Sequence, residues 1–235
     1  MKAVGIIGFK NSGKTHLVKV LAGALSGEGH KVGIVKHAHG RLNVVEKDRA
    51  LYACCRELTV ISDKETGSLR RGSADLEDII SETSADLVLV EGFKLDKTLP
   101  RIICYKDLKE KKQLSTGLEI GFVKIGELTA VDVKKLAAAV RRKAFKLPGI
   151  NCGKCGFKTC FGLAKEIVKG KRAQRDCAYA LASARVRIAG KRVAVNPFVG
   201  KALANVVRGF LQSLKGGQTP GRIEIRIDGR PGKFF

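Results

Sequence analysis

Residues 8–15 read Gly8-Phe9-Lys10-Asn11-Ser12-Gly13-Lys14-Thr15, and they directly follow the apolar run Ala3–Ile7. The spacing Gly-x4-Gly-Lys-Thr between a strand and a helix is that of a phosphate-binding loop. Backbone N–H groups and the helix N-terminus hold phosphate oxygens in such a loop, the lysine reaches the outer phosphates, and the threonine hydroxyl coordinates Mg²⁺. A structural glycine turn is the alternative, but it gives no reason for Lys14 and Thr15. The residues expected to bind a nucleoside triphosphate are Gly8, Asn11, Ser12, Gly13, Lys14, Thr15 and His16.

Acidic residues that can serve this loop follow the expected strands. Glu91 ends the run Asp86-Leu87-Val88-Leu89-Val90-Glu91, at the carboxyl end of a buried strand, where open α/β sheets bind their ligands. We therefore expect Glu91 to act beside the metal and Asp86 to be a strand-start residue. Asp48, in a polar loop, is equally well a surface acid or a residue that reaches the metal or a water. The expected catalytic residues are Lys14, Glu91 and Asp48.

The segment Lys36-His37-Ala38-His39 lies where the second strand runs out toward the same edge of the sheet. Two histidines near a triphosphate can hold a substrate or assist proton transfer. A solvated loop is the alternative for this segment. Lys36, His37 and His39 are therefore further expected binding residues.

Short apolar runs alternate with helix-forming segments over residues 1–147. Such runs suit strands buried on both faces of a sheet. The pattern predicts the α/β class, with a P-loop NTPase-type, mostly parallel sheet and helices on both faces. The expected strands are Ala3–Gly8, Lys31–Lys36, Leu58–Ser62, Asp86–Glu91, Arg101–Tyr105 and Gly121–Ile125. The expected helices are His16–Ser26, Ser73–Thr83 and Thr129–Lys146, the last with Thr129 as its N-cap.

Pro148-Gly149 marks a break between two expected domains, residues 1–147 and residues 148–235. The second domain reads as a small α+β domain. Its expected elements are a cysteine-bearing segment to about Ala180, a hairpin of Arg185–Ile188 with Arg192–Val195, an amphipathic helix Phe198–Leu214 and a strand Arg222–Ile227.

Four cysteines of the second domain have the spacing Cys152-x2-Cys155-x4-Cys160-x16-Cys177. Structural zinc sites usually have two short pairs, whereas this set has one short pair, a single follower and a distant fourth. That spacing favours a 4Fe–4S cluster over zinc or over four free thiols. The glycines that follow the first two cysteines allow backbone N–H groups to approach the sulfurs, and nearby apolar residues can exclude water. Cys54, Cys55 and Cys104 stand outside the spacing and are expected to be packing residues.

The formal charge of +23 is uneven, since residues 148–235 hold 18 Lys and Arg against 4 Asp and Glu. A basic surface attracts nucleic acid, anionic cofactors or acidic proteins. Three Tyr, no Trp and no RNA-stacking motif argue against nucleic acid. The chain begins with a strand instead of a signal peptide and has no long apolar run, so we expect a cytoplasmic protein without a membrane partner.

The loop 8–15, the segment Lys36–His39, the Glu46-Lys47-Asp48 loop and Val90-Glu91-Gly92-Phe93-Lys94 occur in an order and spacing that resemble the molybdopterin-guanine dinucleotide biosynthesis protein B family, MobB. The likeness covers roughly residues 1–140. It implies GTP as the nucleotide, weak hydrolysis, a homodimer, and a place for Lys94 in the site. It also implies two kinds of partner, a guanylyltransferase and a molybdenum or tungsten enzyme or its apoprotein. Residues 149–180 separately resemble small 4Fe–4S domains of corrinoid iron–sulfur proteins and electron-transfer subunits.

The function predicted from these features is that of a GTP-binding accessory protein in biosynthesis or delivery of the molybdenum or tungsten cofactor. The same features predict that it is a slow P-loop NTPase that hydrolyses GTP. A 4Fe–4S cluster and Mg²⁺ accompany the nucleotide in this prediction. One alternative is a nucleotide-gated electron carrier or iron–sulfur scaffold, which an acidic redox partner would suit. A second alternative is a basic nucleic-acid-binding protein, for which steeply salt-dependent binding is the sign.

Overall fold

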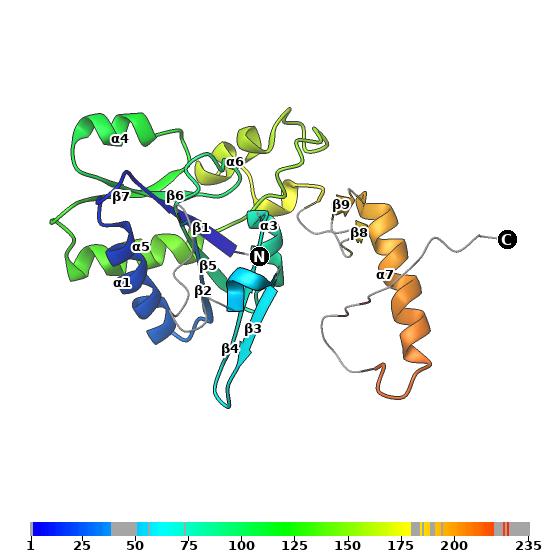
Figure 1. The fold of residues 1–235 in the computed structure, drawn as a ribbon. Helices are drawn as coiled ribbons and strands as arrows, with labels where there is room; N and C mark the ends of the chain where they lie inside the picture. Colours follow the sequence, from blue (N-terminus) through cyan, green and yellow to red (C-terminus); the bar gives the residue numbers. More distant parts are fainter. Residues whose placement is uncertain are drawn as a thin grey trace. The chain divides into compact units, whose positions relative to one another are not determined.

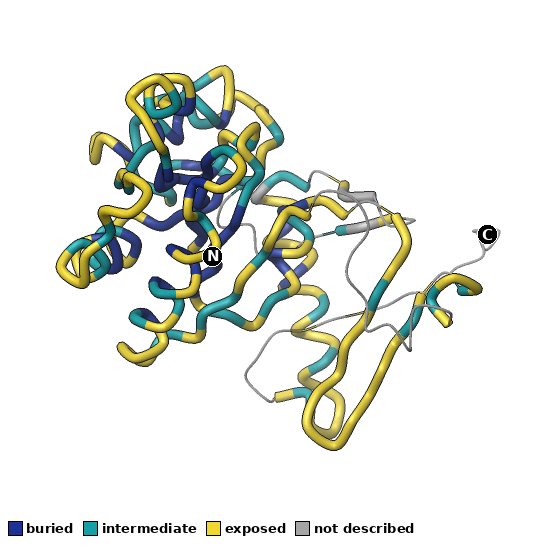
Figure 2. The backbone as a smooth tube through the Cα atoms, turned by 60° about the vertical axis from the view of Figure 1, so that its left-hand side comes forward, coloured by how far each residue is buried: buried dark blue, intermediate teal, exposed yellow. Residues whose placement is uncertain are grey.

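The computed structural model describes residues 2–38, 51–55, 57–72, 74–179, 184, 186–188, 191–193, 195–218, 223 and 225. The chain divides into two compact units, Met1–Ala180 and Leu181–Phe235. Buried segments gather at the centre of the first unit (Figure 2). The expected phosphate loop and the four spaced cysteines all belong to this first unit.

A five-stranded parallel sheet forms the centre of the first unit, with the strand order β2-β5-β1-β6-β7 (Figure 1). The chain leaves β1 for β2 on one side, and later crosses from β5 to β6 on the other side of β1. β1 and β5 therefore stand where the strand order reverses, the usual ligand crevice of such sheets. The strands are β1 (Lys2–Ile7), β2 (Val32–Lys36), β5 (Leu87–Glu91), β6 (Arg101–Tyr105) and β7 (Glu119–Lys124).

Helices cover both faces of this sheet because successive strand residues point to opposite faces. On one face, Val4, Ile6 and Leu89 share a core with α1 (Lys14–Gly27) and α5 (Ala130–Lys143). On the other face, alternate residues of the same strands pack against two shorter helices, α3 (Leu76–Glu82) and α4 (Leu108–Leu114). The predicted α/β class with a parallel, doubly covered sheet is confirmed.

One expected strand has a different place from the one predicted. β3 (Glu57–Ile61) forms close to the predicted segment Leu58–Ser62, but it pairs antiparallel with β4 (Thr66–Arg70) in a separate hairpin. The prediction that it joins the main sheet was wrong. A short turn, in which the Ser62 N–H donates to the Glu65 carbonyl at 2.9 Å, makes the local pairing available. Both strands are mostly exposed, so neither can replace a strand buried on two faces.

The helix expected to end at Lys146 ends at Lys143, although Thr129 is its N-cap as predicted. Ala144 has extended backbone angles, φ −68° and ψ 130°, and the chain then turns inward. Phe145 and Leu147 are buried at 2% and 0% exposure. The apolar pattern of this stretch therefore belongs to an extended segment that packs into a core, and not to a last turn of helix.

The cysteine segment packs against the rest of the first unit through a shared apolar core. This segment contains α6 (Cys160–Val168) and the 3-10 turn η1 (Gln174–Asp176). Its residues Cys160, Leu163 and Cys177 lie in one cluster with three residues from earlier in the chain, namely Leu118, Phe145 and Leu147. The division expected after Leu147 therefore differs from the division into compact units, which falls after Ala180.

The second unit contains the expected hairpin and helix. β8 (Val186–Ile188) pairs antiparallel with β9 (Lys191–Val193), and α7 (Pro197–Gln212) follows with Asn196 as its N-cap. The strand expected at Arg222–Ile227 lies almost wholly outside the described residues. Among the helices that the structure describes, none combines the length and the apolar composition that crossing a membrane requires.

Candidate functional site

The loop between β1 and α1 has the backbone that its sequence predicts. Asn11 and Gly13 have positive φ angles of 58° and 83°, in the left-handed region that favours glycine and asparagine. Gly8 is required for a different reason. A Cβ atom there would stand 2.2 Å from Ser12 Oγ and 2.4 Å from the Cys104 carbonyl oxygen. The loop therefore lies against the end of β6, and only glycine allows that approach.

The first turn of α1 presents free backbone donors to this loop. Gly13 is the N-cap and supplies no side-chain hydrogen bond, and the first turn contains no acidic residue. The first N–H groups of a helix have no partner within the helix, and they carry the positive end of its dipole. The N–H groups of Lys14, Thr15 and His16 are therefore placed to bind an anion such as a phosphate.

Lys14 folds back over the loop that precedes it. Its Nζ donates a hydrogen bond to the Phe9 carbonyl oxygen at 2.5 Å. Burial lowers the pKa of Lys14 from its ordinary value, while Cys104 and Glu91 oppose that shift. The ammonium group is thus held inside the loop, and a phosphate at the helix N-terminus would offer it a stronger, charged partner than a carbonyl.

Thr15, Glu91 and Lys36 meet at the carboxyl ends of β5 and β2. The Thr15 hydroxyl donates to Glu91 Oε1 at 2.7 Å, and Lys36 Nζ lies 3.5 Å from Glu91 Oε2 and 3.4 Å from Thr15 Oγ1. Glu91 is only 6% exposed. A nearly buried carboxylate requires a partner, and here a hydroxyl and an ammonium group supply it. The structure places Glu91 beside Thr15, and its expected role beside the metal stays a prediction.

The pair of Thr15 and Glu91 fits Mg²⁺ together with a nucleotide. Mg²⁺ keeps several waters and is commonly held by one or two protein ligands plus phosphate oxygens, without a full protein cage. Among the residues that the structure describes, no three histidine, cysteine or acidic side chains gather closely enough to hold an ion by themselves. A site completed by phosphates therefore suits these residues better than a site built from protein alone.

The turn after Glu91 brings Phe93 and Lys94 over the same edge. Gly92 and Phe93 both have positive φ, 93° and 51°, which a phenylalanine seldom adopts. The Phe93 ring lies against the His37 ring at a centroid distance of 5.0 Å, and Lys94 Nζ lies 4.3 Å from the centre of the Phe9 ring. A Cβ at Gly92 would come within 2.9 Å of His37 Cβ. Lys94 thus contacts the phosphate loop, and His37 packs against the turn that follows Glu91; their roles in binding stay predictions.

Three expected site residues differ from the others. Ser12 is 1% exposed, and its hydroxyl has no hydrogen-bond partner among the described residues. Any contact between Ser12 and a nucleotide is therefore left to its backbone. His39 and Asp48 lie outside the described residues, so the roles expected for them stay predictions.

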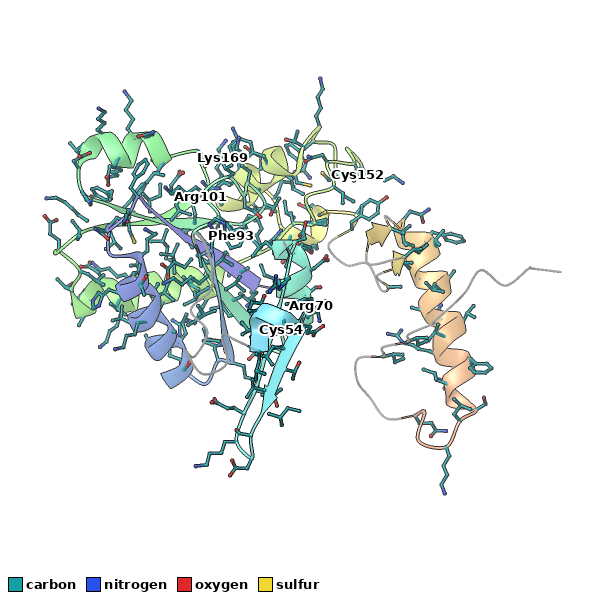
Figure 3. All side chains as sticks on the ribbon, viewed as in Figure 1. Cys54, Arg70, Phe93, Arg101, Cys152 and Lys169 are labelled. Atoms are coloured by element: carbon teal, nitrogen blue, oxygen red, sulfur yellow. The ribbon has the colours of Figure 1, made fainter. Side chains whose placement is uncertain are left out.

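The four spaced cysteines differ in their burial. Cys160 and Cys177 are buried at 6% and 5% exposure, Cys155 is half-buried, and Cys152, labelled in Figure 3, is exposed. None forms a disulfide. Cys160 and Cys177 belong to one apolar cluster, and Cys155 packs against it. Although no three described ligands converge on a single ion, a 4Fe–4S cluster makes a different demand, because each thiolate binds a separate iron atom.

The backbone around these cysteines is open to a bulky ligand. Gly153 and Gly156 have positive φ angles of 73° and 86°, and a Cβ at either position would meet no atom within 4 Å. The Cys160 N–H is held by the Asn151 side chain at 2.8 Å, which fixes the start of α6. Cys152 and Cys155 on a glycine-bearing loop, Cys160 at the start of α6 and Cys177 directly after η1 are together a donor set that fits an iron–sulfur cluster.

Sequence reasoning missed Lys146 and Arg101, the two cations that are buried among the described residues. Lys146 Nζ lies 2.8 Å from Glu77 Oε2 and donates to Thr98 Oγ1 at 2.6 Å. Arg101, only 3% exposed, donates to the Lys94 carbonyl oxygen at 3.3 Å and to that of Asp96. Burial lowers its pKa, with Glu119 and Asp96 opposing. The sequence signal that could have indicated a buried Lys146 is its position between two apolar residues, Phe145 and Leu147.

A parallel sheet with a Gly-x4-Gly-Lys-Thr loop at its strand-order reversal, and an acid on the neighbouring strand, defines a P-loop protein. The family model "Molybdopterin guanine dinucleotide synthesis protein B", MobB, matches residues 3–124, which is more than half of the chain. The chain belongs to this family. A second family model, "Putative Fe-S cluster", matches residues 147–179.

Named relatives extend over different lengths of the chain. A protein of Methanocaldococcus jannaschii named "Putative molybdopterin-guanine dinucleotide biosynthesis adapter protein" is 28% identical over 237 residues, covering 97% of this chain and 98% of its own length. The "Molybdopterin-guanine dinucleotide biosynthesis adapter protein" of Escherichia coli is 26% identical over 110 residues, 42% of this chain and 62% of its own length. The protein of that name from Haemophilus influenzae is 30% identical over 112 residues, with 44% and 62% covered.

Two solved structures are similar to the chain. The crystal structure of Bacillus subtilis MobB has a TM-score of 0.49 at 24% identity, covering 59% of this chain and 98% of its own. That of a MobB homolog from Bacillus stearothermophilus has a TM-score of 0.47 at 25% identity, covering 60% and 99%.

Proposed function

We propose that this chain is a GTP-binding adapter protein in the biosynthesis of molybdopterin guanine dinucleotide, and that its cysteine segment carries a 4Fe–4S cluster. The observation that carries the nucleotide half is the contact of Thr15 with Glu91 at the mouth of the phosphate loop. The family to which the chain belongs and the names of its relatives support the adapter role.

Each residue of the loop has a distinct role in this proposal. The N–H groups at the start of α1 bind phosphate oxygens, and Lys14 turns from the Phe9 carbonyl oxygen toward the outer phosphates. Thr15 would offer an oxygen lone pair to Mg²⁺ while its hydroxyl group keeps its proton and donates it in the hydrogen bond to Glu91. Mg²⁺, when bound, neutralises charge on the phosphates. Lys36 then faces a site already holding a divalent cation, so we expect its ammonium group to move toward a phosphate.

Hydrolysis in this proposal is slow. Glu91 is engaged by Thr15 and Lys36, and the described part of the chain offers no other carboxylate within hydrogen-bond reach of the Thr15 hydroxyl. A carboxylate that orients a ligand of the metal is poorly placed to activate a water as well. Asp48 and His39 stay candidates for that second role. Slow turnover suits an adapter whose bound state is the signal that its partner reads.

The iron–sulfur half of the proposal rests on Cys152, Cys155, Cys160 and Cys177. Three of these thiols lie at one apolar cluster, and the fourth is exposed at the rim. A 4Fe–4S cluster supplies one-electron transfer when bound. The protein's part is to exclude water on the apolar side and to surround the site with positive charge, both of which affect the reduction potential.

The proposed partners follow from the adapter role and the charge. They are a guanylyltransferase, a molybdenum or tungsten enzyme or its apoprotein, an acidic redox protein, and a second copy of the chain in a homodimer. Residues 148–235 hold 18 basic and 4 acidic residues, so an acidic partner surface is the complementary one.

The nucleotide half is tested by calorimetric titration of the anaerobically purified full chain with GTP and with ATP, each with and without Mg²⁺. Lys14→Ala should abolish binding, since it removes the charge that the loop holds for the phosphates. Lys10→Ala is the matched control, because Lys10 is an exposed lysine of the same loop and should leave affinity within about twofold, consistent with the small effect of an exposed charge. Equal losses in both variants would refute the site, and a preference for ATP would refute GTP.

The cluster half is tested on the same preparation by iron and sulfide quantitation and by EPR of the reduced protein. About four iron and four sulfide per chain is the composition of a 4Fe–4S cluster. Cys160→Ser should lower both together, while Cys104→Ser, at a buried cysteine outside the spacing, should lower neither. Zinc in place of iron would overturn this half and leave the nucleotide half standing.

A further inference from the structure

A single loop touches both candidate sites of the first unit. The loop Gly92–Pro100, here called the 92–100 loop, joins the end of β5 to the start of β6. It begins directly after Glu91, whose carboxylate accepts a hydrogen bond from the Thr15 hydroxyl. It ends at Arg101, one of the two buried cations. Between these ends it meets the phosphate loop on one side and the cysteine segment on the other.

At its N-terminal end the 92–100 loop contacts the phosphate loop. Lys94 Nζ lies 4.3 Å from the centre of the Phe9 ring, and Phe9 is the residue whose carbonyl oxygen accepts from Lys14. Phe93 lies against His37 in a strained, positive-φ conformation. Movement of Lys14 or of Glu91 on binding a ligand would therefore displace the first residues of the 92–100 loop.

At its other end the loop is bound to the chain that leads into the cysteines. The Leu147 N–H donates to the Thr98 carbonyl oxygen at 2.8 Å, and Lys146 Nζ donates to Thr98 Oγ1 at 2.6 Å. Lys97 Nζ lies 5.1 Å from the centre of the Phe161 ring, which follows Cys160 directly. Gln174, three residues before Cys177, donates to the Lys146 carbonyl oxygen at 2.8 Å.

The middle of the loop is braced, so the two ends are mechanically connected. Arg101 donates to the carbonyl oxygens of Lys94 and Asp96. The Asp96 carboxylate accepts from the Thr98 N–H at 2.7 Å and from its hydroxyl at 2.5 Å. Phe93 and Arg101, labelled in Figure 3, both line a small cavity of about 10 Å³ beneath the loop. We expect a segment braced by these hydrogen bonds and closely packed beneath to transmit a displacement from one end to the other.

We propose that the 92–100 loop couples the phosphate site to the cysteine segment, so that binding of GTP and Mg²⁺ changes how readily the cluster loses iron. This inference rests on the proposed function at both sites. Coupling between sites is a free energy shared by both, so the cluster must also change the affinity for GTP, and by the same factor at equilibrium. Contacts at both ends of one braced loop are the physical connection that such coupling requires.

The test measures iron release from the full-length, cluster-loaded protein to a ferrous chelator, with and without GTP and Mg²⁺. We expect the nucleotide to change the rate by about fivefold or more, taking the lower end of typical equilibrium coupling between sites as the guide to the size of the effect. The double variant Lys97→Ala, Thr98→Val removes the loop's side-chain contacts to Phe161 and Lys146, and should reduce this ratio to under about twofold. GTP affinity, measured separately on cluster-loaded and iron-depleted protein, should show the same pattern.

Lys165 provides a matched control. Its Nζ lies 4.6 Å from the centre of the same Phe161 ring, but it comes from α6 and not from the 92–100 loop. Lys165→Ala should therefore keep the nucleotide effect on iron release. Lys97→Ala changes only an exposed residue, so it serves as the test if the double variant does not fold. It should also reduce the ratio of the iron-release rates measured with and without nucleotide.

The outcomes separate the coupling from the functions beneath it. If GTP binds and iron is present but the nucleotide leaves iron release unchanged, the proposed function stands and the coupling is overturned. If Lys165→Ala loses the effect as fully as the double variant, the 92–100 loop is not its route. If no GTP binds, or the protein carries no iron, the proposed function and the coupling fail together.

Discussion

Replacing Gly8 by alanine tests the close approach of the phosphate loop to β6. The added Cβ would stand 2.4 Å from the Cys104 carbonyl oxygen, which is backbone of the paired strand β6 and cannot turn aside as a side chain can. The same Cβ would stand 2.2 Å from Ser12 Oγ, within the loop itself. Overpacking of this kind costs about 1–3 kcal/mol. The loop must shift, and we expect phosphate binding to be lost with it.

Gly23→Ala is the matched substitution with the opposite expected sign. Gly23 lies in the middle of α1, and a Cβ there would meet nothing within 4 Å. Alanine stabilises a helix interior by about 0.5–1 kcal/mol relative to glycine. One kcal/mol shifts the Tm of a chain of this size by about 2–4 °C. Gly8→Ala should therefore lower the Tm by about 2–12 °C, and Gly23→Ala should raise it by about 1–4 °C.

The assay is thermal unfolding of the anaerobic protein followed by far-UV circular dichroism, with calorimetric GTP titration of each variant. A Gly8→Ala protein with the Tm and GTP affinity of the parent would refute the reasoning, because the carbonyl contact would then impose no constraint. A Tm of Gly23→Ala below that of the parent protein would refute the assignment of Gly23 to an open helix face.

Three further predictions concern charged or titratable groups. Glu91→Gln should weaken Mg²⁺-dependent GTP binding by tenfold or more, because a hydrogen bond to a charged group contributes about 1.5–3 kcal/mol; titrations with and without Mg²⁺ would show equal affinities if Glu91 did not serve the metal. Lys146→Met should destabilise the fold by about 3–5 kcal/mol in urea unfolding, since it leaves two partly buried carboxylates without their cation, whereas the same change at the neighbouring Lys143 should cost far less. Burial raises the pKa of the Cys104 thiol from 9.0 to about 12, so the folded protein keeps a proton that the unfolded chain loses, and stability should fall as the pH rises between these values; unfolding midpoints across that range should fall less steeply in Cys104→Val, and identical slopes would contradict the assignment.

The parallel sheet and the phosphate loop could be predicted because their signals are local. Apolar runs such as Leu87–Val90 and the spacing of Gly8 to Thr15 each lie within a few residues, and they depend on no distant partner. Glu91 could be placed as well, since the end of a parallel strand fixes which edge its residue occupies.

The predictions failed where a distant partner decides the structure. The strand near Leu58 was assigned to the main sheet because its own residues do not reveal that Thr66–Arg70 would pair with it first. The last turn expected at Ala144–Lys146 was replaced by an extended segment, because Lys146 is drawn to Glu77 and Thr98, far away in the sequence. The bracing of the 92–100 loop by Arg101 was likewise invisible to local patterns.

The core shared by the cysteine segment and the sheet has a consequence for the order in which the protein matures. Leu118, Phe145 and Leu147 leave the ribosome before any of the four spaced cysteines, and they form the surface on which Cys160 and Cys177 come to rest. We therefore expect the sheet to fold before Cys160 and Cys177 reach their buried positions. If the proposed cluster is carried, we expect iron insertion to follow the packing of this core, and a chain whose β7 does not pair with β6 to take up little iron.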